Sequence, residues 1–452
     1  MGTLHRPQDS ENAGSQRSGA ADGIETHQGS RHARDEPRVA GSSLPSVNLA
    51  ATAVAGAVAM AVAMGFGRFS YTPILPAMMT DAGLSPGDAG LIASANFIGY
   101  LAGAVLAAYG WAHGRERLIG LAALAATTLL LAVMGLTSSV LAFCIIRFLA
   151  GLASAFAMIF VSGIVLGQGL AARSEHVPSV HFGGVGFGIA LSSIAVWVAP
   201  LAGVAGFSVS QADWFTGALV ALAGTILVAA LLPGTHQSAN GGRPEAPLVW
   251  TRPLKVMTLT YGFFGFGYVI TATFLVAMAR DASGGHGVEF LAWLLTGISA
   301  ALSVHLWRYA VPRFGLAGVY AAGLLVEAAG LVLTVSLPSA LAPLAGGLML
   351  GATFMMITAY GLQIGRQLAP ESPRRALAFM TAAFGVGQIV GPLVAGWLAE
   401  STGSFALPTL VAAVVLLACG CAVLLELRRI RTALIGEAAY CSAACPGHSF
   451  VK

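Results

Sequence analysis

The chain has 452 residues, of which 56% are hydrophobic and 9% are charged, and its net charge is +4. Soluble globular domains carry about 25% charged residues, so this composition argues against a soluble protein and indicates a membrane protein. The apolar runs have the length of a helical crossing, about 20 residues, rather than that of a barrel strand. The small net charge gives no reason to expect nucleic-acid binding.

The first 47 residues differ from the rest of the chain. They are rich in Gly, Ser, Arg and acidic residues and lack apolar periodicity, which predicts a disordered cytoplasmic tail over residues 1–47. They also lack the short apolar stretch and small-residue cleavage site of a signal peptide, so we expect none to be cleaved.

Twelve apolar stretches follow, each bounded by charges, Pro or Gly-rich turns. Six precede a cytoplasmic linker at residues 233–253: Leu49 to Met79, Gly87 to Ala108, Leu118 to Leu136, Val140 to Leu170, Ser179 to Ala202, and Trp214 to Leu232. Six follow it: Leu254 to Ala279, Phe290 to Ala310, Leu316 to Ser336, Ala340 to Gln363, Ala376 to Ala399, and Phe405 to Leu425. We predict an all-α membrane protein with two six-helix bundles, at residues 48–232 and 254–427, and a cytoplasmic tail at 428–452.

The start of the second helix carries its own signal. Ser85, Pro86 and Asp88 have the pattern of a cap, a first-turn proline and the acid of a capping box.

Basic residues predict the orientation, because cytoplasmic loops retain Lys and Arg. With the N-terminus inside, all but three of the 23 basic residues fall on the cytoplasmic side or in the tails. The exceptions are Arg280, on the outer side, and Arg68 and Arg147, within spans. We therefore expect a multi-pass protein of a bacterial-type cytoplasmic (inner) membrane with both termini in the cytoplasm.

The two halves of the chain repeat each other. GFGRFSYTPILPAMMTDA from Gly65 matches GFGYVITATFLVAMARDA from Gly265 at eight positions, all 200 residues apart, and the same offset pairs Gly151 with Gly351. Six spans per half is an even number, so the halves share one orientation and are related by an axis along the membrane normal. Secondary transporters place substrate sites between such repeats.

At these residues the sequence resembles the major facilitator superfamily, over roughly Asn48 to Leu427. RFLAGLASA, from Arg147 to Ala155, is similar to the superfamily's fourth-helix motif, and GVGQIVGPLVAG, from Gly385, to its glycine-proline helix. The loop YGWAHGRERLIG resembles a degenerate gating loop, which lacks the usual Asp and keeps Arg115 and Arg117. GFGRFSYTPILP followed by LIASANFIGYLAG is similar to the YbfB/YjiJ branch.

The resemblance implies alternating access, with spans one, four, seven and ten around a central cavity. It therefore places Arg68 and Arg147 beside substrate. Intramembrane arginines usually face the bundle interior and mark pathways, and a guanidinium offers a planar fork to carboxylate or phosphate oxygens. The alternatives are that Arg68 snorkels outward or bonds to unwound carbonyls near Pro73 and Pro76, and that Arg147 braces helices.

Other polar residues within spans are candidates for the same cavity. In the first half they are Tyr71, Asn96 and Tyr100; in the second they are Tyr268, at the repeat position of Arg68, and Tyr360 and Gln363. The alternative for Tyr71, Asn96 and Tyr100 is hydrogen bonding between helices.

Energy coupling rests on one residue. Glu327 is the acid at mid-span, and it either carries protons or bonds between helices. GxxxxGK[ST] is absent, so ATP is not the direct fuel, and the fifth span lacks the proline of the drug-antiporter signature. Cys441, Cys445 and His448 are too loosely spaced to predict a metal site, and we expect neither metal nor cofactor.

These observations favour a secondary transporter for a small organic anion or zwitterion. The alternative is an exporter of hydrophobic or sugar-like compounds in which Arg68 is structural. A membrane enzyme or sensor has no support, because neither a nucleophile-base pair nor a soluble output domain is present. The expected partners are a small-molecule substrate, the lipid bilayer and a coupling proton or ion, and we expect a monomer.

Overall fold

A chain that crosses lipid has to satisfy its backbone N–H and C=O groups internally, so helices are the expected elements. The computed structural model describes residues 2, 48–109, 111–174, 176–202, 206–234, 245–281, 285–338 and 340–444. Within these ranges the regular structure is entirely helical, and the residues from Asn48 onward belong to one compact unit. The predicted tail apart from Gly2, residues 235–244 of the predicted linker, and Cys445 with His448 lie outside the described residues.

The first half of this unit contains six crossings. They are the first crossing, made of α1 (Leu49–Met60), the π-helix η1 (Ala61–Phe69) and α2 (Tyr71–Ala82), and then α3 (Pro86–Ala108), α4 (Glu116–Met134), α5 (Val140–Ala171), α6 (His176–Val198), extended by the 3-10 turn η2 (Ala199–Ala202), and α7 (Val209–Leu231). The predicted start of α3 is confirmed, because Ser85 and Asp88 form a capping box and Pro86 opens the helix.

The second half also contains six crossings and ends in a further helix. Its helices are α8 (Arg252–Asp281), α9 (Gly285–Trp307), the 3-10 turn η3 (Arg308–Ala310), α10 (Val311–Ser336), α11 (Leu341–Gln367), α12 (Pro373–Thr402), α13 (Ala406–Leu425) and α14 (Leu427–Ala444). The run of 52 residues from α9 through α10 would be about 78 Å long as one helix, more than twice the roughly 30 Å hydrocarbon core. The backbone turns at Gly315, where φ is 70°, so this run is two crossings and the predicted total of twelve is confirmed.

The C-terminal segment that the sequence analysis treats as a tail begins with α14. Glu426, just before α14, accepts a hydrogen bond from Arg429 at 3.0 Å and pairs with Arg252 at the start of α8. The two arginines lower the pKa of the Glu426 carboxyl. This ionic cluster holds the start of α14 close to the start of α8.

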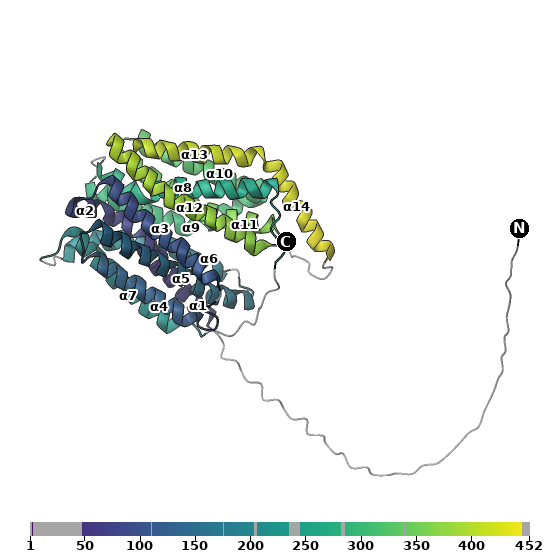
Figure 1. Cartoon of the computed structure of the whole chain (residues 1–452), viewed down its shortest axis with the longest axis horizontal. Coiled ribbons are helices and arrows are strands. Elements are labelled where there is room, and N and C mark those ends of the chain that lie inside the picture. Colours follow the sequence, from purple (N-terminus) through teal and green to yellow (C-terminus); the bar gives the residue numbers. More distant parts are fainter. Residues whose placement is uncertain are drawn as a thin grey trace, which may run out of the picture. The chain divides into compact units, whose positions relative to one another are not determined.

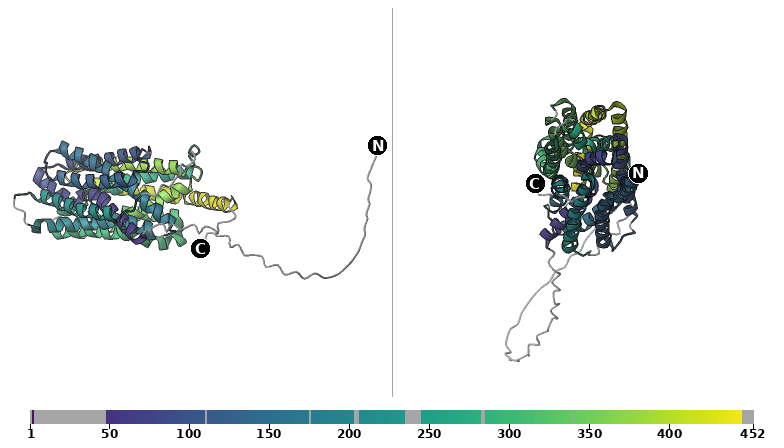
Figure 2. Two further views of the ribbon diagram at one scale, coloured as in Figure 1. Left: turned by 90° about the horizontal axis from the view of Figure 1, so that it is seen from below. Right: turned by 90° about the vertical axis from the view of Figure 1, so that its left-hand side faces the viewer.

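The helices of the unit run side by side. Figure 1 shows α8, α10, α12 and α13 grouped above α4, α5 and α7, and Figure 2 shows the bundle from two further sides. We call the end at which residues 245–251 lead into α8 the linker end. The opposite end, at which Ser85, Ser208 and Phe405 precede α3, α7 and α13, is the distal end.

The two halves meet through α3 with α12, α6 with α9, and α2 with α8. Ser94 Oγ donates a hydrogen bond to the Ile389 carbonyl at 2.8 Å. Thr72 Oγ1 donates to the Ala272 carbonyl, which joins two positions that are equivalent in the repeat. Because α2 forms the distal part of the first crossing, these contacts close the distal end between the halves.

The internal repeat recurs as a repeated packing contact. A Cβ atom at Gly151 on α5 would collide with the Asn96 carbonyl on α3, and a Cβ atom at Gly351 on α11 would collide with the Thr296 carbonyl on α9. Both members of the second contact lie 200 residues after those of the first. Each half therefore uses a glycine to bring its second and fourth crossings into backbone contact.

Candidate substrate site

The first crossing is not a regular α-helix at its centre. Its sequence places Gly65 and Gly67 before Pro73 and Pro76, and each proline removes a backbone donor and clashes with the carbonyl four residues earlier. Ala61–Phe69 winds as a π-helix, a form that often occurs at functional sites. The segment therefore has backbone carbonyls that need partners from outside the helix.

Arg147 on α5 supplies those partners. Its Nη1 atom donates to the Gly67 carbonyl at 3.1 Å and its Nη2 atom to the Arg68 carbonyl at 3.0 Å. The guanidinium carbon also lies 4.9 Å from the ring centre of Tyr71, and the Arg147 residue is 3% exposed. Both arms of the fork thus bind backbone, which is the bracing geometry that the sequence analysis gave as the alternative for Arg147.

Arg68 has a different environment. The residue is 5% exposed, and its Nε and Nη2 atoms have no hydrogen-bond partner among the described residues. Its guanidinium carbon lies 4.1 Å from the ring centre of Tyr100 and 4.9 Å from that of Phe97, distances at which a cation is attracted to an aromatic face. Arg68 is therefore a buried cation with hydrogen-bond donors to spare.

Three other predicted residues join this cluster. Asn96 Nδ2 donates to the Arg147 carbonyl at 2.9 Å, and Asn96 Oδ1 is buried without a partner among the described residues. The Tyr71 hydroxyl donates to the Ala89 carbonyl at 3.0 Å and the Tyr100 hydroxyl to Met158 Sδ at 2.6 Å. These polar tips bond between helices, and the rings of Tyr71 and Tyr100 face the two guanidinium groups.

The second half contributes Tyr268 on α8. Its ring stacks against Phe354 and Phe384, with centroids 5.8 and 5.6 Å away, and its hydroxyl accepts a hydrogen bond from Gln388 Nε2. Phe354 also contacts Phe69 of the first half, with the ring centroids 6.0 Å apart. Tyr268 therefore belongs to an aromatic cluster that joins the halves near Arg68.

A small hollow lies at this junction. It is lined by Phe69, Tyr268, Trp293 and Phe354, among others, and has no room for a water molecule. The conformation therefore has its halves packed together at the centre, with Arg68 beside the junction rather than in open water.

Tyr360 and Gln363 are not brought together with this cluster. Tyr360 follows Phe354 by six residues, which is about 9 Å along α11 toward the linker end, and its hydroxyl donates to the Val304 carbonyl at 3.3 Å. Gln363 lies further along and is exposed. A contact from either residue to a ligand at Arg68 would need a ligand that extends toward the linker end.

Glu327 lies inside the second half, between α10 and α11. Thr353 Oγ1 donates to its Oε2 atom at 3.1 Å, and its Oε1 atom is buried without a partner among the described residues. This contact is the bond between helices that the sequence analysis gave as the alternative to proton transfer. A proton-coupling role stays a prediction.

The loop residues Arg115 and Arg117 act within the first half. Arg117 donates through Nε to the Leu232 carbonyl at 3.1 Å and through Nη2 to the Ala229 carbonyl at 2.9 Å. It thus satisfies carbonyl groups at the C-terminal end of α7. Arg115 precedes α4 and is exposed.

Sequence reasoning did not single out Gln388 or Phe354. Gln388 lies within GVGQIVGPLVAG, whose resemblance to a glycine-proline helix does not indicate the direction of its polar side chain. Phe354 gave no separate signal, because a phenylalanine in an apolar helix is ordinary. Among the described residues, no group of three His, Cys, Asp or Glu side chains is arranged to hold a metal ion.

Twelve crossings in two repeated halves of one orientation, with a discontinuous first helix and a buried cation where the halves meet, are the architecture of a parallel-repeat membrane transporter. The chain belongs to the family described as "Uncharacterised MFS-type transporter YbfB", whose model matches residues 60–424. The resemblance to the major facilitator superfamily and to its YbfB branch is therefore confirmed.

Comparison with solved structures supports the fold. The crystal structure of the nucleoside transporter NupG has a TM-score of 0.65 and 15% identity, over 84% of this chain and 99% of that one. A bacterial homologue of the human lysosomal transporter Spinster, in an inward-facing and occupied conformation, has a TM-score of 0.62 and 13% identity, over 84% and 96%. A search of curated proteins gives no match.

Proposed function

We propose that this protein is a secondary active transporter that moves a small organic anion or zwitterion by alternating access. The observation that carries the proposal is Arg68, a buried cation with two unpartnered nitrogen atoms beside the junction of the halves. A buried charge without a partner is costly, so a ligand that supplies an anionic group there gains a strong interaction.

The chemistry of the group indicates the class of ligand. A guanidinium presents parallel N–H donors that match the two oxygens of a carboxylate or phosphate. The aromatic faces of Tyr268 and Phe354 lie close to the same junction, and aromatic faces attract cations. A zwitterion could place its acidic group on Arg68 and its ammonium group against these rings.

Alternating access requires the two halves to part at one end while they close at the other. The contacts between α2 and α8 and between α3 and α12 lie toward the distal end. We propose that the linker end is cytoplasmic, on the basis of the arginine distribution, and that Glu327 is the group to test for proton coupling.

The alternative is an exporter of hydrophobic or sugar-like compounds. The observation that favours it is the stacking of Arg68 on Tyr100 and Phe97, because these rings can serve as permanent structural partners for the guanidinium. In that case the aromatic cluster around Tyr268, and not Arg68, would contact the substrate.

A ligand screen with matched compounds tests the two readings. The purified protein is heated with carboxylates and with their neutral amides, since a ligand of the folded state raises its apparent stability. The anion reading expects the acids alone to raise the melting temperature, and expects Arg68→Ala to lose this effect while the exposed control Arg313→Ala keeps it. Stabilisation by amides and acids alike, unchanged in Arg68→Ala, would favour the export reading.

A further inference from the structure

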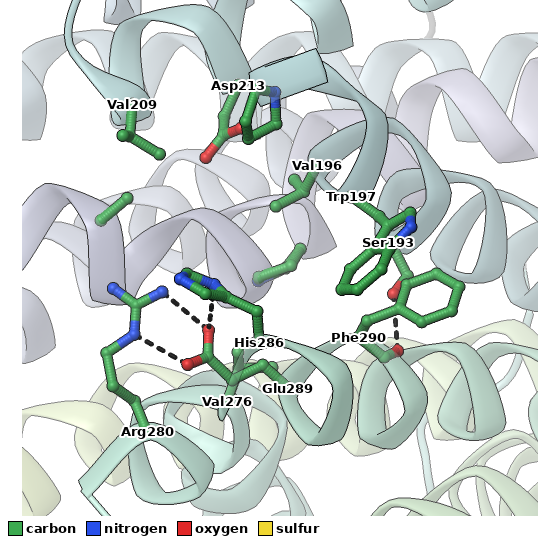
Figure 3. Close-up of a pocket in the computed structure, with 13 residues that line it drawn as sticks. Ser193, Val196, Trp197, Val209, Asp213, Val276, Arg280, His286, Glu289 and Phe290 are labelled. Atoms are coloured by element: carbon green, nitrogen blue, oxygen red, sulfur yellow. Dashed lines mark hydrogen bonds and ion pairs between the residues drawn. The ribbon is translucent and has the colours of Figure 1, made fainter. Parts of the chain in front are cut away.

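A second hollow lies at the distal end, away from Arg68. It has a volume of about 300 Å³ and is walled by α2, α6 and α7 from the first half and by α8 and α9 from the second (Figure 3). Small-molecule pockets begin at about this size. None of the residues predicted for the substrate site lines it.

One side of the hollow carries a closed ion pair. Arg280 donates through Nε to Glu289 Oε1 at 2.9 Å and through Nη2 to Glu289 Oε2 at 2.7 Å. His286 Nδ1 lies 3.9 Å from the same carboxylate. Glu289 is thus compensated by a bidentate partner and is not available to a ligand as a free anion.

Asp213 faces this pair from the opposite side. Figure 3 shows its carboxylate directed into the hollow, across from Arg280 and His286. The residue is 1% exposed, and its Oδ1 atom has no hydrogen-bond partner among the described residues. No ion pair joins Asp213 to a basic residue within the described part of the chain, and Arg280 acts on it only at a distance, so Asp213 supplies the carboxyl group of the hollow that is open to a ligand.

The remaining wall is aromatic. Trp197 and Phe290 lie with their ring centroids 4.9 Å apart, and both line the hollow with Val196 and Val276. Ser193 is already used, since its hydroxyl donates to the Phe290 carbonyl at 2.8 Å. The hollow therefore combines one unpaired carboxylate with aromatic and aliphatic surface.

We infer that this hollow binds a small organic cation that has one ammonium group and a short apolar body. Asp213 accepts hydrogen bonds from the ammonium group, and Trp197 and Phe290 cover the apolar body and contribute cation–π attraction. A calcium or magnesium ion fits less well, because such an ion takes about six or more oxygen ligands and one carboxylate is free.

Because residues of both halves form its walls, the hollow changes shape when one half moves against the other. A ligand that contacts both halves binds more tightly to this conformation than to one in which the halves are separated. It therefore shifts the population toward the state whose distal end is closed. An organic cation in this hollow would act as a regulator of alternating access and not as the transported substrate.

Binding of butylammonium chloride to the full chain in lipid nanodiscs tests the inference by calorimetry. The matched probes are 1-butanol, which keeps the apolar body without the charge, and sodium chloride at the same ionic strength. We expect saturable binding of butylammonium alone. The assignment would be overturned if the wild-type protein did not bind butylammonium, or if it bound 1-butanol equally well. It would also be overturned if sodium displaced butylammonium as effectively as butylammonium itself.

Variants place the binding in this hollow. Asp213→Asn keeps the shape and removes the charge, and we expect it to weaken butylammonium binding at least about tenfold. Glu371→Gln, at an exposed acid between α11 and α12 at the linker end, should leave binding unchanged. If Asp213→Asn does not fold, Phe290→Leu serves in its place and should weaken binding by removing an aromatic face. Equal affinity in the folded Asp213→Asn or Phe290→Leu protein and the wild type would contradict the inference.

Discussion

Arg147 donates a hydrogen bond to the backbone carbonyl of Arg68, so one intramembrane arginine holds the backbone of the other. The bond from Arg147 Nη2 to the Arg68 carbonyl fixes the backbone from which the Arg68 side chain extends. Arg68 in turn keeps two nitrogen atoms without partners. We therefore propose that Arg147 is a positioning residue and that Arg68 contacts the ligand.

The first prediction concerns Arg68→Lys. Lysine keeps the charge but loses the planar fork, so we expect the affinity for an anionic ligand to fall by one to two powers of ten, in line with roughly 1.5–3 kcal/mol for hydrogen bonds to charged groups. Arg68→Ala should abolish binding, while the protein stays folded and inserted. Affinity and melting temperature are measured for both variants, and unchanged affinity in well-folded Arg68→Ala protein would refute the anion site.

The second prediction concerns Arg147→Ala. Removing the fork leaves the buried carbonyls of Gly67 and Arg68 without their partners, and each unsatisfied buried group costs about 1–3 kcal/mol. We expect a clear fall in melting temperature, in contrast to Arg68→Ala. Arg313→Ala, at an exposed position, is the control. A melting temperature equal to that of the control would show that η1 does not depend on Arg147.

At this scale the sequence predicted the polar neighbours of Arg68 in the first half and Tyr268 in the second, but not Phe354 or Gln388, which contact Tyr268. Arg68, Tyr71 and Asn96 could be chosen because charge and polarity inside an apolar span are rare. The choice between ligand contact and bracing could not be made, because it depends on which carbonyls the neighbouring helix meets. Asp213 was missed for a similar reason: its surroundings come from helices that are distant in sequence, including the one that carries Arg280.

Helix packing in each half depends on glycines at close backbone contacts. Gly151 on α5 and Gly351 on α11 each face a carbonyl of the neighbouring helix, so that no side chain can be added without a shift of backbone. The adjacent Asn96 to Arg147 hydrogen bond depends on the same close approach. Helix packing in α5 and the geometry of the arginine cluster are therefore linked.

The third prediction compares two glycines of α5. Gly151→Ala places a methyl group against the Asn96 carbonyl, and overpacking of this kind costs about 1–3 kcal/mol. Gly163→Ala adds the same group where nothing lies within 4 Å, and the better helix propensity of alanine should leave stability equal or higher. Thermal denaturation of both variants is the measurement, and equal melting temperatures would contradict the packing argument.

The elements themselves were largely predictable. Apolar length and the arginine boundaries define the twelve crossings, because the bilayer sets the length that a span needs. The π-helical winding of Ala61–Phe69 was not predictable, since it depends on support from Arg147 on another helix. The helix α14 was not predicted, because membrane-spanning helices were identified by long apolar runs and Leu427–Ala444 lacks one.

The two halves of the unit meet along α3 with α12 and α6 with α9, and at the distal part through α2 with α8, and the repeat explains the last of these contacts. Thr72 and Ala272, 200 residues apart, meet each other directly. Equivalent residues of two repeats come into contact where they lie next to the axis that relates them. The central hollow and the distal hollow are both walled by residues of both halves, so any movement of one half against the other changes both.

The fourth prediction concerns orientation. A reporter joined after residue 240 in the linker should behave as cytoplasmic, and one joined after residue 404, before α13, should behave as external, because basic residues are retained on the cytoplasmic side. Green fluorescent protein and alkaline phosphatase give opposite signals at each site and control for expression. A linker fusion with phosphatase activity and without fluorescence would reverse the assignment.

The last prediction concerns the conformation of the whole molecule. Ser85 Oγ lies 3.3 Å from Glu400 Oε2 across the halves at the distal end, whereas α5 and α11 are not among the helix pairs in extensive contact. In a background without the five native cysteines, Ser85→Cys with Glu400→Cys should be joined by a short thiol cross-linker. Gly167→Cys with Gln363→Cys, toward the linker end, should react far less. Substrate or butylammonium that favours the distally closed state should increase the first reaction without increasing the second. Efficient cross-linking of the linker-end pair alone would show that the protein in solution closes at the other end, and the distal hollow would then lack one of its walls.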